Sequence, residues 1–277
     1  MIVFPNCKIN LGLQILTERE DGYHNIETVF YPIPLKDALE IVLADGGEEQ
    51  VVFSSSGYPI NGDTKDNLCL RAYYLLKKDF PDFPAIKIHL HKAIPMGAGL
   101  GGGSADAAFT LQLLNSLFGL NIPVAQLLDY SLQLGSDCPF FIINTPCIGL
   151  SRGEVLKEIK LALSAYNIVL VNPGIHVNTG LAFKALNVNA NHLTNTSVQN
   201  IIQQPIDNWQ HHLKNDFEEP VFQKYPVIKN IKETLYKQGA AYAAMSGTGS
   251  TVFGLFKKDL PIKLNFDPAF FIQNLSL

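Results

Sequence analysis

The chain has 277 residues, of which 47% are hydrophobic and 17% are charged, so it can bury one large core or two ordinary ones. Its formal net charge of -4 supplies no overall basic surface, which argues against a protein that binds nucleic acid or anionic lipid by general electrostatic attraction. The four cysteines form no CxxC pair, the start lacks the pattern of a signal peptide, and no apolar run could span a bilayer. We therefore expect a reduced, cytoplasmic protein.

The first part of the chain is predicted to consist of strands and one helix. Alternation of apolar with polar or small residues predicts strands at residues 7–16, 23–33, 39–46, 49–57 and 86–94. The turn-forming segment 17–22 joins the first two strands into a hairpin. Residues 66–80 have the apolar spacing of an amphipathic helix.

Five glycines then occur among residues 97–103, directly between a predicted strand and an alanine-rich helix. Ordered glycine costs backbone entropy, so this concentration indicates a path that side chains would obstruct. A glycine-rich turn that leads into a helix presents unpaired N–H groups and the positive end of the helix dipole to one point, which suits phosphate. Ser104 could add a hydroxyl donor or cap the helix, whereas the charge of Asp106 should point away from a bound phosphate unless a cation lies between them.

The rest of the chain is predicted to continue the mixed pattern. The helix after the glycines carries an apolar stripe, and Pro123 opens another helical segment that ends near Gly135. From about residue 156 the pattern restarts, with a strand at 166–174, helices, and a strand, turn and strand at 240–256. We expect the Asn-rich segment 187–200 to be a surface loop.

The glycine segment has three other interpretations. A P-loop needs GxxxxGK[ST], and this loop contains no lysine. Gly97, Gly99 and Gly102 match GxGxxG, but the strand and acidic residue expected after a dinucleotide-binding helix do not follow. The third alternative is a loop that only changes the direction of the chain between the strand and the helix. The high density of glycines disfavours it.

The stretch PMGAGLGGGSADAA at 95–108 resembles the second conserved motif of the GHMP kinases, the family of galactokinase, homoserine kinase and mevalonate kinase. Further segments occur in the order seen in one branch of this family: NCKINLGL at 6–13, DGYHNIETVF at 21–30, DNL at 66–68, LGSDCPFF at 134–141 and SGTGSTVF at 246–253. The resemblance covers nearly the whole chain. Its most specific part is the coincidence of KINL and DGYH with GGGSADAA.

The resemblance implies an α+β fold with the two-domain GHMP kinase architecture. An ATP-binding N-terminal domain like domain 2 of ribosomal protein S5 would cover residues 1–155, and a ferredoxin-like C-terminal domain would cover residues 156–277. It also implies ATP with Mg²⁺ as co-substrate, no permanently bound cofactor, and a cytidine diphosphate-linked polyol of isoprenoid precursor synthesis as the acceptor. We expect no nucleic-acid or membrane partner, and a monomer or weak homodimer.

Two residues are expected to be catalytic. From its position alone, Asp137 could simply cap a helix that starts at Cys138, and Lys8 could be a solvent-facing lysine on a strand whose other face carries Cys7 and Ile9. The resemblance implies that Asp137 is a general base for the substrate hydroxyl. It implies that Lys8 pairs with Asp137 and stabilises charge on the reacting groups.

The resemblance also implies two sets of binding residues. The ATP-binding set is Asn67, Lys92, Pro95, Gly97, Gly99, Gly101, Gly102, Gly103 and Ser104. The substrate-binding set is Asn10, Tyr23, His24, Thr179, Phe183, Gly247 and Thr248. Within it, Tyr23, His24 and Phe183 would form the cytidine pocket, whereas from the residues alone each could be an ordinary packing residue. No chemistry is assigned to Arg152 and Glu154 of the SRGE stretch.

Two alternative functions follow from the same residues. One is a GHMP kinase for another small alcohol, such as homoserine or mevalonate, which the DGYH segment disfavours. The other is an RNA-binding or nucleotide-sensing module without catalysis. The absence of a basic patch in the sequence and the presence of both Lys8 and Asp137 count against it.

Overall fold

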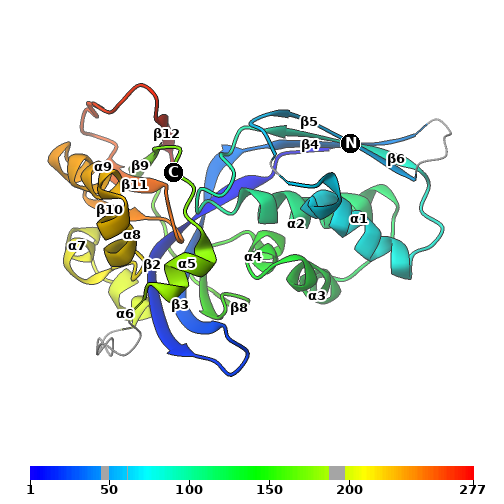
Figure 1. The fold of residues 1–277 in the computed structure, drawn as a ribbon, viewed down its shortest axis with the longest axis horizontal. Coiled ribbons are helices and arrows are strands. Elements are labelled where there is room, and N and C mark those ends of the chain that lie inside the picture. Colours follow the sequence, from blue (N-terminus) through cyan, green and yellow to red (C-terminus); the bar gives the residue numbers. More distant parts are fainter. Residues whose placement is uncertain (45–49, 61, 187–196) are drawn as a thin grey trace. The chain divides into compact units, whose positions relative to one another are not determined.

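The computed structural model describes residues 1–44, 50–60, 62–186 and 197–277 (Figure 1). The chain forms two compact units, each assembled from separate stretches of sequence. Unit 1 consists of residues 1–7, 35–96 and 101–145, and unit 2 consists of residues 8–34, 97–100 and 146–277. The fold is α+β, as the sequence predicts.

Unit 1 has a four-stranded sheet in the order β1-β4-β6-β5. Its strands are β1 (Ile2–Val3), β4 (Ala38–Leu43), β5 (Val51–Gly57) and β6 (Ile86–Lys92). β4 pairs antiparallel with β6, and β5 pairs parallel with β6. The alternation in β6 buries Ile86, Ile88 and Leu90 on one face and leaves the histidines between them more exposed.

The helices of unit 1 lie together beside this sheet (Figure 1). They are α1 (Leu68–Asp79), α2 (Gly102–Leu117), α3 (Val124–Leu134) and α4 (Cys138–Ile143), with a short 3₁₀ turn, η1 (Thr64–Asp66), before α1. The predicted apolar stripe of α2 is confirmed, because Ala107, Ala108, Leu111 and Leu114 are buried. This helix packs against α1, α3 and α4.

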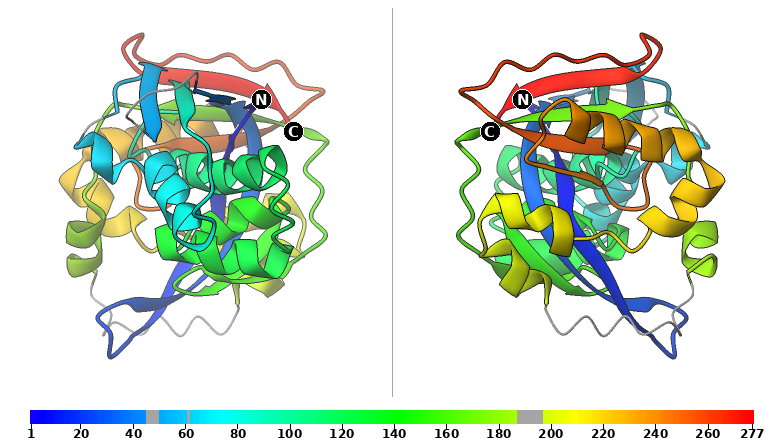
Figure 2. Two further views of the ribbon diagram at one scale, coloured as in Figure 1. Left: turned by 90° about the vertical axis from the view of Figure 1, so that its right-hand side faces the viewer. Right: turned by 90° about the vertical axis from the view of Figure 1, so that its left-hand side faces the viewer.

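Unit 2 contains an antiparallel sheet in the order β10-β11-β9-β12. Its strands are β9 (Tyr166–Asn172), β10 (Tyr242–Met245), β11 (Val252–Lys257) and β12 (Phe271–Ser276). The helices are α5 (Thr179–Lys184), α6 (Val198–Ile202), α7 (Trp209–His212), α8 (Glu218–Lys224) and α9 (Pro226–Lys237), with the 3₁₀ turn η2 (Ile206–Asn208) before α7. Figure 2 shows β12 in red at the edge of the sheet.

The core of unit 2 lies between its helices and this sheet. Ile228, Ile231 and Leu235 recur along one side of α9 and pack on the buried face formed by Val169 and Val252. The predicted strand, turn and strand over residues 240–256 are confirmed as β10 and β11, which pair antiparallel from Tyr242 and Leu255 to Met245 and Val252.

A third sheet has the order β2-β3-β7-β8. It contains β2 (Asn6–Glu18), β3 (His24–Lys36), β7 (Cys147–Ser151) and β8 (Val155–Glu158). The predicted hairpin is confirmed, with strands longer than expected. β3 pairs antiparallel with β7, which is why most of the N-terminal hairpin belongs to unit 2.

The compact units do not follow one boundary in the sequence. We predicted domains at 1–155 and 156–277, but the hairpin and residues 97–100 group with the later part of the chain because their strand partners lie there. Most of the predicted Asn-rich loop, residues 187–196, lies outside the described residues, and residues 198–200 begin α6 rather than continuing a loop. Among the described helices, none is both long and apolar enough to cross a membrane.

Candidate active site

The glycine loop adopts backbone conformations that require glycine. Gly97, Gly99 and Gly101 have φ values of 61°, 78° and 70°. A Cβ on Gly99 would lie 2.0 Å from the carbonyl oxygen of Ser246, so this position also needs the missing side chain for space. The prediction that side chains would obstruct the path of this backbone is therefore confirmed at Gly99.

Residues 97–100 are fixed within unit 2 by hydrogen bonds to two other predicted site segments. Thr251 N–H donates to the Ala98 carbonyl at 3.2 Å, and Lys8 N–H donates to the Leu100 carbonyl at 2.9 Å. The Ser246 hydroxyl donates to the Gly99 carbonyl at 2.8 Å. The loop is thus attached to the strand that carries Lys8 and to the turn that carries Gly247.

The loop ends at the N-terminus of α2, where Gly101 is the N-cap and no side chain caps the helix. The N–H groups of the first turn, from Gly102 to Ser104, are left for another acceptor, as at any uncapped helix start. Ser104 does not cap α2, which corrects that alternative, because it lies inside the helix. Burial raises the pKa of the Cys138 thiol to about 12.

Three charged side chains, Lys92, Asp37 and Asp106, form a buried cluster that includes one residue of α2. Lys92 is 1% exposed, and its ammonium pairs with Asp37 and, at 2.7 Å, with Asp106 on α2. Asp37 also accepts the N–H groups of Ala93 and Ile94 at 2.6 Å and 2.9 Å. Lys92 is therefore not a solvated lysine at the end of a strand, since two carboxylates stabilise it in the interior. Its predicted contact with ATP stays a prediction.

Burial, together with the nearby charge of Asp37, raises the pKa of Asp106 to about 7 even though Lys92 favours the carboxylate. The pKa of Lys92 is also raised: burial lowers it, but the two carboxylates more than compensate. The carboxyl groups of Asp37 and Asp106 therefore share the ammonium group of Lys92. Sequence reasoning did not predict the part played by Asp37, because its partners are distant in sequence.

Unit 1 contains a cavity of about 280 Å³ beside α1 and α2. Its lining includes Asn67, Met96, Gly103 and Asp106, and apolar side chains from Phe53, Ile60, Leu68 and Leu90. Asn67 caps α1 by accepting the Cys69 N–H at 2.9 Å. The structure thus brings Asn67 and Gly103, both predicted to bind ATP, to one cavity, whereas Pro95 is not among its lining residues.

Asp137 directly precedes α4, and the predicted helix start at Cys138 is confirmed. The side chain of Asp137 makes no capping hydrogen bond to this helix. Pro139 in the first turn lacks an N–H, which leaves fewer donors for a cap. The capping role that sequence position suggests is therefore wrong for the carboxylate, although the helix start does fix where Asp137 lies.

Lys8 is buried in unit 2, where it is 3% exposed and lies on the same side of β2 as Asn10. Its ammonium donates to Asn10 Oδ1 at 2.6 Å and lies 5.2 Å from the centre of the Phe30 ring. The Asn10 amide in turn donates to Thr28 Oγ1 at 3.0 Å. The interpretation of Lys8 as a solvent-facing edge lysine is wrong, and the predicted shared face of Lys8 and Asn10 is confirmed.

The three aromatic side chains expected around a base lie in unit 2 near the hairpin turn. The rings of His24 and Phe183 are stacked with centres 4.9 Å apart and planes at 24°. Phe183 also packs edge-on against the buried Phe217. Tyr23 is 53% exposed, and the Arg152 guanidinium lies 4.8 Å from its ring centre. The structure therefore brings His24 and Phe183 together and leaves much of the Tyr23 ring accessible.

Two further predicted substrate residues also meet in unit 2. The hydroxyls of Thr179, at the start of α5, and Thr248 are 3.3 Å apart. The turn that carries Gly247 and Thr248 is held by Asn215, whose amide donates to the carbonyls of Met245 and Gly247 at 2.8 Å each. Asn215 is 2% exposed, and sequence reasoning did not identify it.

The comparisons with known proteins agree with this fold and loop. The models of the GHMP kinases N terminal domain and the GHMP kinases C terminal domain match residues 67–145 and 197–264. The chain belongs to the GHMP kinases, and it is a small-molecule kinase that uses ATP.

Individual proteins of this family are similar to this chain over nearly its whole length. A protein of Bacteroides fragilis named 4-diphosphocytidyl-2-C-methyl-D-erythritol kinase is 48% identical over 274 residues, which cover 99% of this chain and 98% of that protein. A protein of the same name from Cytophaga hutchinsonii is 50% identical over 277 residues, covering 100% of this chain and 97% of its own.

The solved structures give the same result. The crystal structure of a 4-(cytidine 5'-diphospho)-2C-methyl-D-erythritol kinase matches with a TM-score of 0.78 and 32% identity, over 92% of this chain and 90% of that one. Mevalonate kinase of Methanococcus jannaschii matches with a TM-score of 0.69 at 14% identity, over 94% of this chain and 91% of that one, which shows a common fold. The predicted GHMP kinase architecture is confirmed.

Proposed function

We propose that this chain transfers the γ-phosphoryl group of ATP to the 2-hydroxyl of 4-diphosphocytidyl-2-C-methyl-D-erythritol. The products are ADP and the 2-phosphate, and the step belongs to the non-mevalonate (methylerythritol phosphate) pathway to isoprenoid precursors. The observation that carries this proposal is the 48% to 50% identity, over at least 99% of this chain, to two proteins of that name.

In this proposal the glycine loop and the first turn of α2 bind the phosphates of ATP. Backbone N–H groups without an intrahelical partner, and no Cβ at Gly101 to Gly103, suit the close approach of an anion. Mg²⁺ bound to the nucleotide would supply charge neutralisation on the β- and γ-phosphates. We assign Asn67 to the nucleoside side because it lines the cavity beside the loop.

The proposed chemistry needs one proton acceptor and one fixed positive charge. Asp137 accepts the proton of the 2-hydroxyl as its oxygen forms a bond to the γ-phosphorus, and the bond from that phosphorus to the leaving oxygen of ADP breaks. Lys8 stabilises the negative charge on the reacting oxygens. Supporting this assignment, the Asp137 carboxylate is not used as a helix cap, and Asn10 orients the Lys8 ammonium.

The acceptor is recognised by unit 2 in this proposal. Tyr23, His24 and Phe183 bind the cytosine, because flat rings stack on a base and histidine can hydrogen-bond to its edge. Thr179 and Asn10 contact the erythritol end, and Gly247 and Thr248 contact phosphate groups. The Thr179 to Thr248 hydroxyl contact supports a shared polar subsite for this end of the substrate.

The test is ADP release by the purified protein with ATP and magnesium. Four acceptors are compared in parallel: 4-diphosphocytidyl-2-C-methyl-D-erythritol, homoserine, mevalonate and galactose. We expect release only with the cytidyl compound. Release with another alcohol alone would overturn the substrate assignment and keep the kinase. Release with none of the four would overturn the proposed function.

A further inference from the structure

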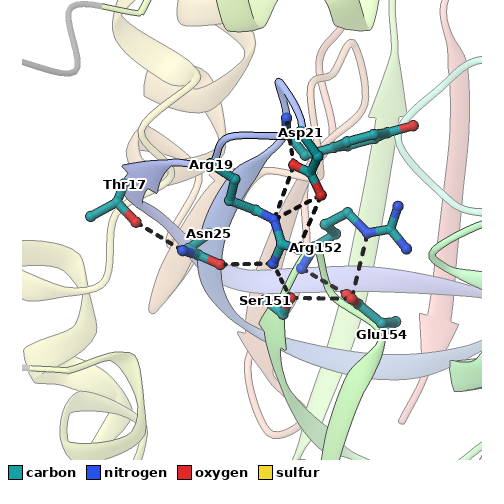
Figure 3. Close-up of polar contacts among 8 residues, drawn as sticks. Thr17, Arg19, Asp21, Asn25, Ser151, Arg152 and Glu154 are labelled. Atoms are coloured by element: carbon teal, nitrogen blue, oxygen red, sulfur yellow. Dashed lines mark hydrogen bonds and ion pairs between the residues drawn. The ribbon is translucent and has the colours of Figure 1, made fainter.

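The turn of the hairpin between β2 and β3 is tied to the segment between β7 and β8 by a continuous polar network (Figure 3). The Arg19 guanidinium donates to both carboxylate oxygens of Asp21 and, at 2.8 Å, to Ser151 Oγ. The Ser151 hydroxyl donates to Glu154 at 3.1 Å. Asp21 closes the turn by accepting the N–H of Tyr23 at 3.1 Å.

The same network fixes Arg152. Glu154 accepts the Arg152 backbone N–H at 2.7 Å and pairs with its side chain at 3.5 Å. The Glu154 side chain is only 14% exposed. Burial raises the pKa of this carboxyl, but hydrogen bonds from backbone N–H groups and Ser151, with the charge of Arg152, bring the net shift below its ordinary value. Glu154 therefore remains charged and continues to hold Arg152 at neutral pH.

The path of contacts that starts at the backbone of Tyr23 returns to its ring. From Asp21 it passes through Arg19, Ser151 and Glu154 to the guanidinium of Arg152, which lies 4.8 Å from the centre of the Tyr23 ring. A cation at this distance from an aromatic ring is attracted to its face. Tyr23 as a residue is 53% exposed, and Arg152 occupies one face of its ring, so the other face is the one on which a flat ligand would stack.

We propose that Arg152 is a positioning residue for Tyr23: by occupying one ring face it holds the other ready to stack on the pyrimidine base of a cytidine nucleotide. This inference rests on the proposed function, since that function supplies the base. A side chain ordered before binding loses less entropy when the base arrives. The effect therefore belongs to recognition of the nucleoside and not to phosphoryl transfer.

The test compares two variants. Arg152→Met keeps a flexible apolar side chain without the guanidinium, and Arg152→Lys keeps the positive charge without the planar guanidinium group. We expect Arg152→Met to raise KM for the cytidyl substrate about fivefold to tenfold, with kcat and KM for ATP unchanged. Arg152→Lys should give a smaller increase. Lys224→Met is the matched control, because it removes a lysine 5.3 Å from the Tyr225 ring and should leave all three constants unchanged.

Binding of cytidine diphosphate alone provides a readout without catalysis. Arg152→Met should weaken it by the same factor, and should have no further effect once Tyr23 is replaced by leucine. Unchanged KM and unchanged affinity would overturn the positioning role. A rise in both KM values with a lower melting temperature would also overturn it, because the residue would then only hold the fold. If the wild type binds cytidine diphosphate but releases no ADP, the proposed function fails and the binding comparison still tests Arg152.

Discussion

Asp137 shows how two roles of one residue can be separated. It immediately precedes α4, where an aspartate commonly stabilises a helix by accepting backbone N–H groups. Its carboxylate makes no such bond here, so replacing Asp137 removes no cap from α4. Thermal unfolding measured beside activity then separates a chemical role of Asp137 from a structural one.

Asp137→Asn is expected to lower kcat by about a thousandfold or more, because the amide cannot accept the substrate proton. The affinity for ATP and the melting temperature should stay close to those of the wild type. Ser197→Ala is a suitable control, because Ser197 does cap α6 and its loss should cost about 1 kcal/mol of stability. Steady-state kinetics, calorimetric ATP titration and thermal unfolding measure these effects. Equal loss of turnover and ATP binding would contradict the assigned role.

Asp106 makes stability depend on pH in a direction unusual for an acid. Its pKa in the folded protein is about 7, whereas its ordinary value is 3.8, so between these values the folded state binds more protons than the unfolded chain. The contribution of this group to the free energy of unfolding therefore falls as pH rises through that window. It is fully present below about pH 4 and lost above about pH 7.

Asp106→Asn removes this dependence while leaving Lys92 paired with Asp37. We expect the stability of the wild type, measured relative to the variant by urea unfolding, to fall by a few kcal/mol between about pH 4 and about pH 8. Asp82→Asn, at an exposed position, is the control. A stability difference for Asp106→Asn that does not change with pH would contradict the raised pKa of Asp106.

At the scale of elements, the glycine loop and α2 combine two separate requirements for glycine. Gly99 needs a positive φ and space beside the Ser246 carbonyl. Gly103 needs neither, since it is helical and the nearest atoms to an added Cβ are 3.9 Å away. Replacing Gly99 thus tests the fold, and replacing Gly103 tests whether a ligand approaches the helix start.

Gly99→Ala is expected to destabilise the protein by about 1–3 kcal/mol from its backbone conformation alone, and by more through the overlap with Ser246. Gly103→Ala should leave the free energy of unfolding unchanged or slightly higher, yet raise KM for ATP at least about tenfold, because a Cβ would hold the phosphates away from the amides. Chemical denaturation and ATP kinetics separate the two effects. An unchanged KM in Gly103→Ala would place the phosphates elsewhere.

At the scale of the whole molecule, the charge distribution distinguishes a small-molecule kinase from a nucleic-acid binder. The chain carries 21 lysines and arginines against 25 acidic residues. At least two of these basic side chains, Lys8 and Lys92, are buried and engaged with other groups in unit 2 and unit 1 respectively. They therefore add nothing to an exposed basic surface.

We expect no measurable RNA binding at about 150 mM salt, because such binding depends on releasing counterions from phosphates neutralised by exposed lysine and arginine. A fluorescence titration with labelled single-stranded and structured RNA, repeated at lower salt, measures it. Tight binding that persists at moderate salt would revive the RNA-binding alternative for this fold.

Much of the fold could be predicted because many of its strands and helices follow from the spacing of apolar residues within short segments. Alternation in residues 86–94 predicts β6, and the apolar stripe after the glycines predicts α2. β7 and β12 were not predicted, since five and six residues of mixed polarity carry little local signal, and they become strands only by pairing with β3 and β9. The interleaved compact units were missed for the same reason.

The sequence by itself determined the glycine loop, the hairpin, the shared face of Lys8 and Asn10, and through family motifs the kinase class. These features depend on residue type and on the spacing of residues close together in the chain, both of which can be read directly from the sequence. Only the tertiary structure decided that Lys92 is buried between Asp37 and Asp106, that Asp137 does not cap its helix, and that Arg152 lies over Tyr23. Each of these depends on desolvation or on partners far apart in sequence, because electrostatic energy follows distance in space and burial.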